Sequence, residues 1–207
     1  SGAGKSTLLK LIALIERPTR GQVTVNNLNV ASVSRSRIPA FRRQIGVVFQ
    51  DHKLLADRTI FDNVALPLII AGVGTREIGK RVRAALDQVG LLAREQALPL
   101  ELSTGEQQRV GIARAVVSKP PVLIADEPTG NLDPDLSLEV MQIFRRFNEV
   151  GVTVLVASHD IRLLERFGLR RVRLEGGRIQ DETVHATSQS EAAAPALVDP
   201  ASFLGME

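Results

Sequence analysis

Cysteine, tryptophan and tyrosine are missing from this sequence of 207 residues. Without cysteine, neither disulfides nor thiolate metal sites can form, and this composition fits a reducing compartment such as the cytoplasm. The three histidines, His52, His159 and His185, are too scattered along the chain to predict a zinc site. The lack of tyrosine and tryptophan also leaves few side chains on which nucleic-acid bases could stack.

Long apolar runs are missing as well. The longest, residues 64–73, is interrupted by Pro67 and is well short of the roughly 20 residues that a membrane-spanning helix needs. We therefore expect no membrane span. With 44% apolar residues the chain can still bury a sizeable core, as one compact domain or as one domain with a subdomain.

Charge is distributed unevenly along the chain. Residues 181–207 hold five acidic residues and no Lys or Arg, so the part before them is more basic than the overall net charge of +3 indicates. A basic body can favour nucleotides, nucleic acids or an anionic membrane surface. Its arginines are spread out without interleaved aromatics, which favours solvated helix faces over a nucleic-acid interface. Residues 181–207 also lack hydrophobic periodicity, and we expect them to form a flexible acidic tail.

Strand and helix patterns alternate through much of the sequence. Patterns of buried strands occur at residues 45–49, 122–125 and 152–157, and the continuous apolar run at 122–125 is typical of a parallel strand that is covered on both faces. Apolar residues at helical spacing begin at Lys5 and again after Asp133. This alternation predicts an α/β fold with a parallel-sheet core.

Two regions depart from this alternation. Helical patterns predominate between about residues 52 and 118, at 60–70, 76–89 and 105–118, which predicts a helical subdomain inserted into the α/β core. Later, two short strand patterns flank a Gly-Gly turn within residues 171–179, which predicts an antiparallel hairpin at the edge of the fold.

The sequence opens with a glycine-rich segment that matches most of the phosphate-binding loop G-x-x-x-x-G-K-[ST], whose first glycine would precede residue 1. Small residues allow successive backbone N–H groups to surround a phosphate, Lys5 can reach its β and γ oxygens, and the Ser6 hydroxyl can ligate Mg²⁺. A plain glycine-rich turn before a helix is the alternative. The predicted nucleotide-binding residues of this loop are Ser1, Gly2, Ala3, Gly4, Lys5, Ser6 and Thr7.

Polar residues follow each predicted buried strand, where ligands bind in open α/β sheets. Asp126 is expected to hold Mg²⁺, directly or through water, and Glu127 to polarise the water that attacks the γ phosphorus. Gln50 could contact Mg²⁺ or the attacking water through its amide. His159 could donate to the γ phosphate and orient that water. Taken alone, each of these residues also has a purely structural interpretation.

The segment Leu102-Ser103-Thr104-Gly105-Glu106-Gln107-Gln108-Arg109 resembles the LSGGQ signature of ATP-binding cassette (ABC) ATPases. Six motifs occur in the order of that family: residues 1–7, Gln50, 102–109, 122–127, 131–133 and His159. The resemblance implies a P-loop NTPase fold, ATP and Mg²⁺ as ligands, and ATP hydrolysis. It also implies a homodimer in which Ser103 and Gly105 of one subunit face the γ phosphate bound by the other. Residues 1–180 would be the nucleotide-binding domain, without its N-terminal strands.

One position departs from the family pattern. Thr104 occupies the place of the first signature glycine, and a β-branched residue tolerates positive φ poorly. We therefore expect backbone strain at Thr104 and a reduced but detectable turnover of ATP.

Residues 49–55, 57–59, 62–64, 67–72 and 105–116 carry a closer resemblance, which spans about residues 1–180. They are similar to those of family members that act in bacterial cell division. This resemblance implies that dimer closure moves an integral membrane protein, that no nucleic acid takes part, and that the chain is cytoplasmic and peripheral on the inner face of the bacterial cell membrane. Residues 54–72, which come shortly after Gln50, are the expected docking surface for the membrane partner. The main alternative is the ATPase subunit of a lipoprotein or small-molecule exporter.

Two other interpretations are less well supported. DNA-repair members of the family insert a long coiled coil before the signature, and translation members usually carry two cassettes, whereas neither feature is found here. A regulatory nucleotide-binding module without hydrolysis would suit Thr104, but Glu127 and His159 argue against it.

Overall fold

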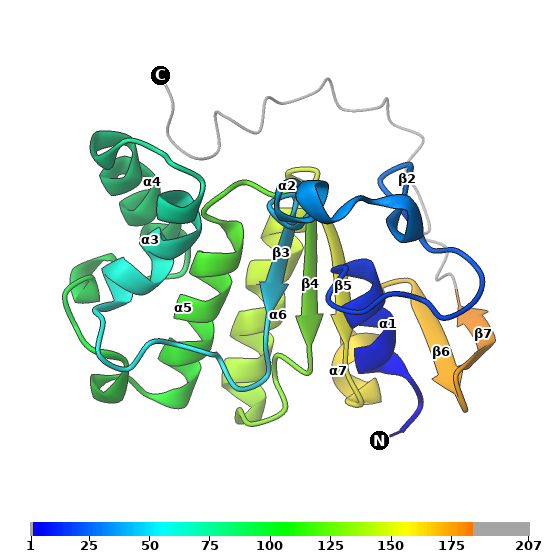
Figure 1. Cartoon of the computed structure of the whole chain (residues 1–207). Coiled ribbons are helices and arrows are strands. Elements are labelled where there is room, and N and C mark those ends of the chain that lie inside the picture. Colours follow the sequence, from blue (N-terminus) through cyan, green and yellow to red (C-terminus); the bar gives the residue numbers. More distant parts are fainter. Residues whose placement is uncertain (1, 184–207) are drawn as a thin grey trace, which may run out of the picture.

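The computed structural model describes residues 2–183 and contains the predicted parallel sheet (Figure 1). The sheet has the strand order β3-β4-β5, formed by β3 (Ile45–Val48), β4 (Val122–Asp126) and β5 (Thr153–Ala157). All three strands run in the same direction, and Asp126 at the end of β4 pairs with Ala157 at the end of β5. The predicted acidic tail lies almost entirely outside the described residues.

Two apolar cores cover the opposite faces of β4. Alternate side chains of a strand point to opposite faces, so Leu123 and Ala125 join one core and Ile124 joins the other. The core around Leu123 includes α5 (Thr104–Val116) and α6 (Pro134–Glu149), and the core around Ile124 includes α1 (Lys5–Ile12). Because helices cover both faces, the strand ends are held firmly, and α1 and α5 both begin at the end of the molecule where the three strands finish (Figure 1).

The helix-rich region contains the predicted helices close to their expected bounds. α3 (Ile60–Ile70) is capped by Thr59, whose side chain accepts a hydrogen bond from Asp62 N, and α4 (Thr75–Gln88) follows it. Both helices pack on α5, and their fully buried side chains include Val64, Leu68 and Leu86. None of the helices in the described residues is long and apolar enough to cross a bilayer.

The remaining elements are short. β1 (Thr24–Val25) and β2 (Leu28–Asn29) form an antiparallel pair whose turn, Asn26-Asn27, has positive φ at both residues, as a tight hairpin turn requires. The connections to and from the sheet contain η1 (Val30–Ser32), η2 (Arg35–Arg37), α2 (Ile38–Arg42), η3 (Leu92–Arg94), η4 (Pro99–Glu101) and α7 (Ile161–Arg166).

The predicted hairpin is also present. β6 (Arg171–Glu175) and β7 (Arg178–Thr183) pair antiparallel around Gly176-Gly177, which again has positive φ at both positions. In the described residues it forms a two-stranded sheet of its own and does not extend the parallel sheet.

The first helix differs from its prediction. The apolar spacing of Leu8, Ile12 and Ile15 predicts one helical face that continues to the breaker Pro18, but α1 ends at Ile12. The chain leaves the helix at Leu14, which has φ 52°, and Ile15 is 48% exposed. The turn therefore ends the helix before proline is reached.

Candidate nucleotide site at the carboxyl ends of the strands

The phosphate-binding loop leads directly into the N-terminus of α1. Gly2 and Gly4 have φ 86° and 97°, in the region that favours glycine, and the carbonyl of Gly4 accepts the first helical hydrogen bond from Leu8 N. Lys5, Ser6 and Thr7 form the first turn of the helix, where free N–H groups and the helix dipole favour an anion. Ser1 lies outside the described residues.

Three of the predicted site residues meet at one carboxylate, that of Glu127. Its Oε1 lies 3.2 Å from Lys5 Nζ, and its Oε2 lies 2.8 Å from His159 Nδ1. The backbone N–H of His159 also donates to Oε2, at 3.2 Å. The Glu127 side chain is only 15% exposed, so the structure brings a phosphate-loop residue and two strand-end residues together in a partly shielded place.

The backbone of Glu127 is held in an unusual conformation. Its φ is 47°, which is uncommon for a residue with a side chain and persists only when neighbours fix it. Two hydrogen bonds do so: Glu127 N donates to Ala157 O at 2.9 Å, and Gly130 N donates to Glu127 O at 3.1 Å. The turn after β4 therefore aims this carboxylate toward α1 and the end of β5.

Asp126 is one of the residues that the sequence predicts as metal ligands. Asp126 is half-buried at the end of β4, and its buried Oδ1 has no hydrogen-bond partner. Buried polar atoms are normally paired, so a lone carboxylate oxygen suits a hard cation. The described residues contain no group of three or more His, Cys, Asp or Glu that could hold a metal by themselves. A cation here would need ligands from hydroxyl, amide or phosphate oxygens.

Gln50 lies beyond the end of β3 and beside the turn that follows β4. A methyl group added to Gly130 would lie 3.5 Å from Gln50 Nε2 and 3.5 Å from Glu127 O. Gln50 itself is exposed. The structure thus brings the predicted amide next to the Glu127 turn, as expected from adjacent parallel strands.

The signature forms the N-terminus of α5 through a complete capping box. Ser103 Oγ accepts from Glu106 N at 3.3 Å, while Glu106 Oε2 accepts from Ser103 N and Ser103 Oγ, each at 2.8 Å. These hydrogen bonds, with the one from Ser103 N as the largest effect, lower the pKa of Glu106. Gly105 packs on α6, since a methyl group there would lie 2.9 Å from Leu136 Cδ1. Ser103 therefore caps α5 and Gly105 packs on α6, whereas Lys5 and His159 both contact Glu127.

The expected strain at Thr104 is wrong. Thr104 is the first residue of α5 after the cap Ser103 and is not among the residues with positive φ. Ser103, with φ −63° and ψ 160°, makes the change from extended to helical backbone, so Thr104 adopts ordinary helical geometry that any residue tolerates. Without this strain there is no longer a reason to expect reduced turnover of ATP.

One contact of the phosphate loop has no counterpart in the sequence prediction. Gly177 N, in the turn between β6 and β7, donates to Ala3 O at 3.1 Å. The Gly-Gly pair predicted the turn, but no sequence signal indicated that the turn would lie on residues far away in the chain.

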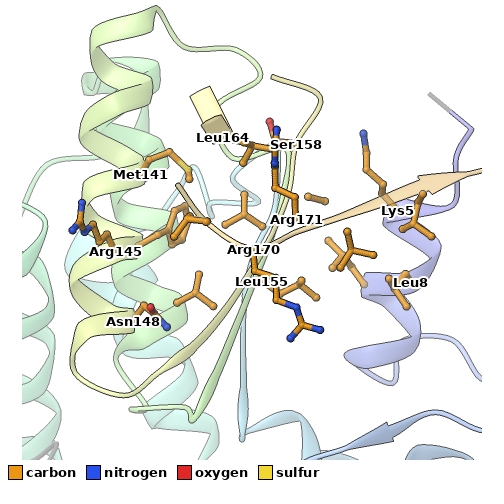
Figure 2. A pocket seen from close by; sticks show the side chains of 18 of the residues that line it. Lys5, Leu8, Met141, Arg145, Asn148, Leu155, Ser158, Leu164, Arg170 and Arg171 are labelled. Atoms are coloured by element: carbon orange, nitrogen blue, oxygen red, sulfur yellow. The ribbon is translucent and has the colours of Figure 1, made fainter. Parts of the chain in front are cut away.

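An apolar cavity of 570 Å³ lies beside this site, between α1, α6, β5 and the β6-β7 hairpin (Figure 2). Leu8, Leu155 and Leu164 are among its lining residues. Lys5 stands at its rim, with the ammonium group directed away from the interior. Because Lys5 is the one predicted site residue in its lining within the described chain, this cavity is distinct from the nucleotide site.

Comparisons with known proteins place the chain in a family. Residues 1–130 match the sequence model of the ABC transporter family. The chain belongs to this family. It is 56% identical to the cell division ATP-binding protein FtsE of Escherichia coli K12 over 185 residues, which cover 89% of this chain and 83% of that protein. FtsE of Bacillus subtilis is 48% identical over 184 residues, covering 88% of this chain and 81% of that protein.

Solved structures agree with this assignment. The dimeric structure of MJ0796, a bacterial ABC transporter cassette, has a TM-score of 0.81 and 37% identity, and covers 90% of this chain and 82% of that chain. A post-hydrolysis state of the same cassette, bound to ADP and Pi, has a TM-score of 0.80 and 36% identity over 89% and 82% of the two chains. The predicted α/β P-loop NTPase fold is confirmed, and the chain is an ABC-type ATPase that resembles FtsE.

Proposed function

We propose that this ATPase hydrolyses MgATP as a head-to-tail homodimer and moves an integral membrane protein in bacterial cell division. The cluster around Glu127 supports the catalytic part most directly. One carboxylate lies 3.2 Å from the phosphate-loop Lys5 and 2.8 Å from His159. A base held beside the residues that bind the γ phosphate is the arrangement that hydrolysis of a triphosphate needs.

Glu127 acts as the general base of this reaction. Its carboxylate accepts a proton from the attacking water while the water oxygen bonds to the γ phosphorus and the bond to the bridging oxygen breaks, which releases ADP and phosphate. The backbone N–H of His159 fixes the orientation of the carboxylate by donating to Oε2, and the ring of His159 can donate to the γ phosphate. Lys5 stabilises the charge on the β and γ oxygens, and the N–H groups of residues 1–7 surround the phosphates.

Ser6, Gln50 and Asp126 would hold Mg²⁺. The unpartnered Asp126 Oδ1 supports this assignment, and all three side chains offer the oxygen ligands that the ion prefers. When bound, Mg²⁺ neutralises the charge that develops on the transferred phosphoryl group.

Ser103 and Gly105 would act on the nucleotide of the other subunit. The capped N-terminus of α5 points out of the same end of the molecule as the strand ends (Figure 1), and a helix N-terminus binds phosphate oxygens well. The structure of a cassette 37% identical to this chain is described as dimeric. This supports a homodimer that forms around ATP.

The membrane partner would be an integral membrane protein of the FtsX type, and residues 54–72 would contact it from the cytoplasmic side. Leu55, Ile69 and Ile70 in this segment are 43%, 55% and 68% exposed. Leu55 belongs to the loop after Gln50, and Ile69 and Ile70 lie at the far end of α3. Exposed apolar side chains of this kind suit a docking surface. Relatives in several bacteria are named cell division proteins, which favours this role over lipoprotein or small-molecule export.

The domain layout follows from the same proposal. Residues 1–180 would form the nucleotide-binding domain, with residues 52–118 as its helical subdomain. The expected boundary of the tail at residue 181 is too early, because residues 181–183 belong to β7 and pair with β6.

Glu127→Gln tests the catalytic assignment. It keeps the size of the side chain but removes the base, so ATP turnover should fall about 10²-fold or more while nucleotide binding is retained. Glu149→Gln, a change at an exposed helix residue paired with Arg145, should turn over ATP at the wild-type rate. Equal turnover by Glu127→Gln and wild type would contradict the assignment.

A further inference from the structure

The loop that connects Gln50 to α3 has a demanding backbone conformation. His52 and Lys53 are consecutive residues with φ 57° and 51°, in the left-handed region that side-chain-bearing residues rarely adopt. Lys53 also turns back on Asp51, through a hydrogen bond from its N–H to the Asp51 carbonyl and an ion pair of 2.6 Å. Such a conformation persists only when the surrounding structure holds it.

Arg114, on α5, holds this part of the loop. Its Nη1 donates to Lys53 O at 2.7 Å and its Nη2 donates to His52 O at 2.5 Å. The planar fork of a guanidinium suits two adjacent acceptors, and both acceptors are main-chain carbonyls, not carboxylates. Arg114 is partly buried, and burial lowers the pKa of its guanidinium.

A different residue holds the far end of the same loop. Asn63, on α3, is fully buried and accepts from Leu55 N at 2.8 Å, while its amide donates to the carbonyls of Leu55, Arg58 and Thr59. The loop is therefore attached to α3 near its end and to α5 near Gln50. Arg114 is the attachment that lies closest to the predicted catalytic amide.

The helix that carries Arg114 is firmly seated. Val110, Ile112 and Ala113 are fully buried around it, and the same helix begins at the capped signature residue Ser103. Because Arg114 is part of this helix, its guanidinium holds the two carbonyls that it binds at a fixed place relative to the helix.

We propose that Arg114 is a positioning residue for Gln50: by binding His52 O and Lys53 O, it sets where the Gln50 amide lies relative to the Glu127 turn and links that amide to the signature helix. This rests on the proposed function, because it requires that Gln50 takes part in hydrolysis. Arg114 acts through the loop and does not touch the nucleotide.

A double-mutant comparison of Arg114→Gln and Gln50→Ala tests the proposal by steady-state ATP hydrolysis. Arg114→Gln should lower kcat about tenfold, as expected for loss of hydrogen bonds to a charged group, with KM for ATP changed less than about twofold. In the Gln50→Ala background the same change should cost less than about twofold, because there is no amide left to position. Arg114→Lys keeps the positive charge but loses the planar guanidinium, so its kcat should fall between those of wild type and Arg114→Gln.

Arg146→Gln is the matched control. Arg146 also donates to a main-chain carbonyl that is distant in sequence, that of Gln88 at 3.3 Å, but it lies far from the Gln50 loop. The kcat of Arg146→Gln should stay at the wild-type value. Hydrogen exchange of residues 51–58 should rise in Arg114→Gln and not in Arg146→Gln.

The outcomes separate the two proposals. If Gln50→Ala lowers kcat but Arg114→Gln does not, the positioning role is overturned and the catalytic assignment stands. The same conclusion follows if Arg114→Gln lowers kcat by the same factor in the wild-type and Gln50→Ala backgrounds. If Gln50→Ala hydrolyses ATP at the wild-type rate, the role of Gln50 in the proposed function fails, and the role of Arg114 fails with it.

Discussion

The two functional regions of this molecule are built in different ways. The cluster of Lys5, Glu127 and His159 is assembled from three segments far apart in the chain, and its central residue has φ 47°. The signature is assembled from neighbours: Ser103 and Glu106 cap each other, and the helix that they begin has ordinary geometry. The first region therefore depends on the tertiary structure, and the second depends mainly on local sequence.

This difference has a consequence for function. A cluster held by long-range contacts can place a base and a lysine beside one nucleotide within a single chain. A capped helix end presents donors outward, so it can serve a second molecule without being rebuilt. A site shared between two subunits would combine both properties: a cluster assembled within one chain and a helix end that faces outward.

Lys5→Ala should break the first region and have the largest effect. It removes the cation beside Glu127 Oε1, which is also the group proposed to reach the β and γ oxygens, so turnover should fall about 10²-fold or more and ATP binding should weaken. An ATP hydrolysis assay measures the turnover, and a nucleotide titration measures the binding of ATP. Lys10→Ala, on the exposed part of the same helix, is the control and should match wild type. Retained ATP binding and turnover in Lys5→Ala would show that Lys5 does not contact the phosphates.

Ser103→Ala should have a smaller effect on the second region. It removes the hydroxyl that accepts from Glu106 N, which should lower the free energy of unfolding by about 1 kcal/mol. Turnover should fall about tenfold, because the proposed donor to the γ phosphate is lost, while nucleotide binding by the isolated chain should stay unchanged. Thermal unfolding and ATP hydrolysis measure these two effects. A tenfold loss of nucleotide binding by the monomer would place Ser103 in its own subunit's site.

Thr104→Gly should have the smallest effect. Because Thr104 has helical geometry and no positive φ, removing its side chain relieves no strain, and turnover should change by less than about twofold. Steady-state hydrolysis at saturating ATP measures it. A clear rise in turnover would restore the view that Thr104 impairs the signature.

The sequence predicted most of the scaffold, and the structure brings together Lys5, Glu127 and His159, three of the predicted site residues. α3 has its predicted bounds, and the strands that end in Asp126 and near Gln50 and His159 occur as expected, because continuous apolar runs and capping residues are local signals. Adjacent parallel strands then bring their ends together. The early end of α1 was missed, since the turn at Leu14 has no glycine or proline to indicate it.

Three other features could not be predicted, for physical reasons. The error at Thr104 came from carrying a glycine geometry over to a position that a helix N-cap makes ordinary. The contacts of Gly177 with Ala3 and of Arg114 with His52 and Lys53 join residues that are distant in sequence, so no local pattern encodes them. Spacing along the chain predicts elements, whereas such contacts depend on how the elements pack.

Mixing two defective variants tests most directly whether two copies of the chain share each site. In a mixed dimer of Lys5→Ala and Ser103→Glu subunits, one site has both defects, but the other combines an intact phosphate loop with an intact signature. Each variant alone should be nearly inactive, and Ser103→Glu should be so because its carboxylate repels the γ phosphate. The mixture should hydrolyse ATP at a rate well above the sum of the rates of the two separate variants. A mixture that hydrolyses ATP only at that sum would contradict a site shared between subunits.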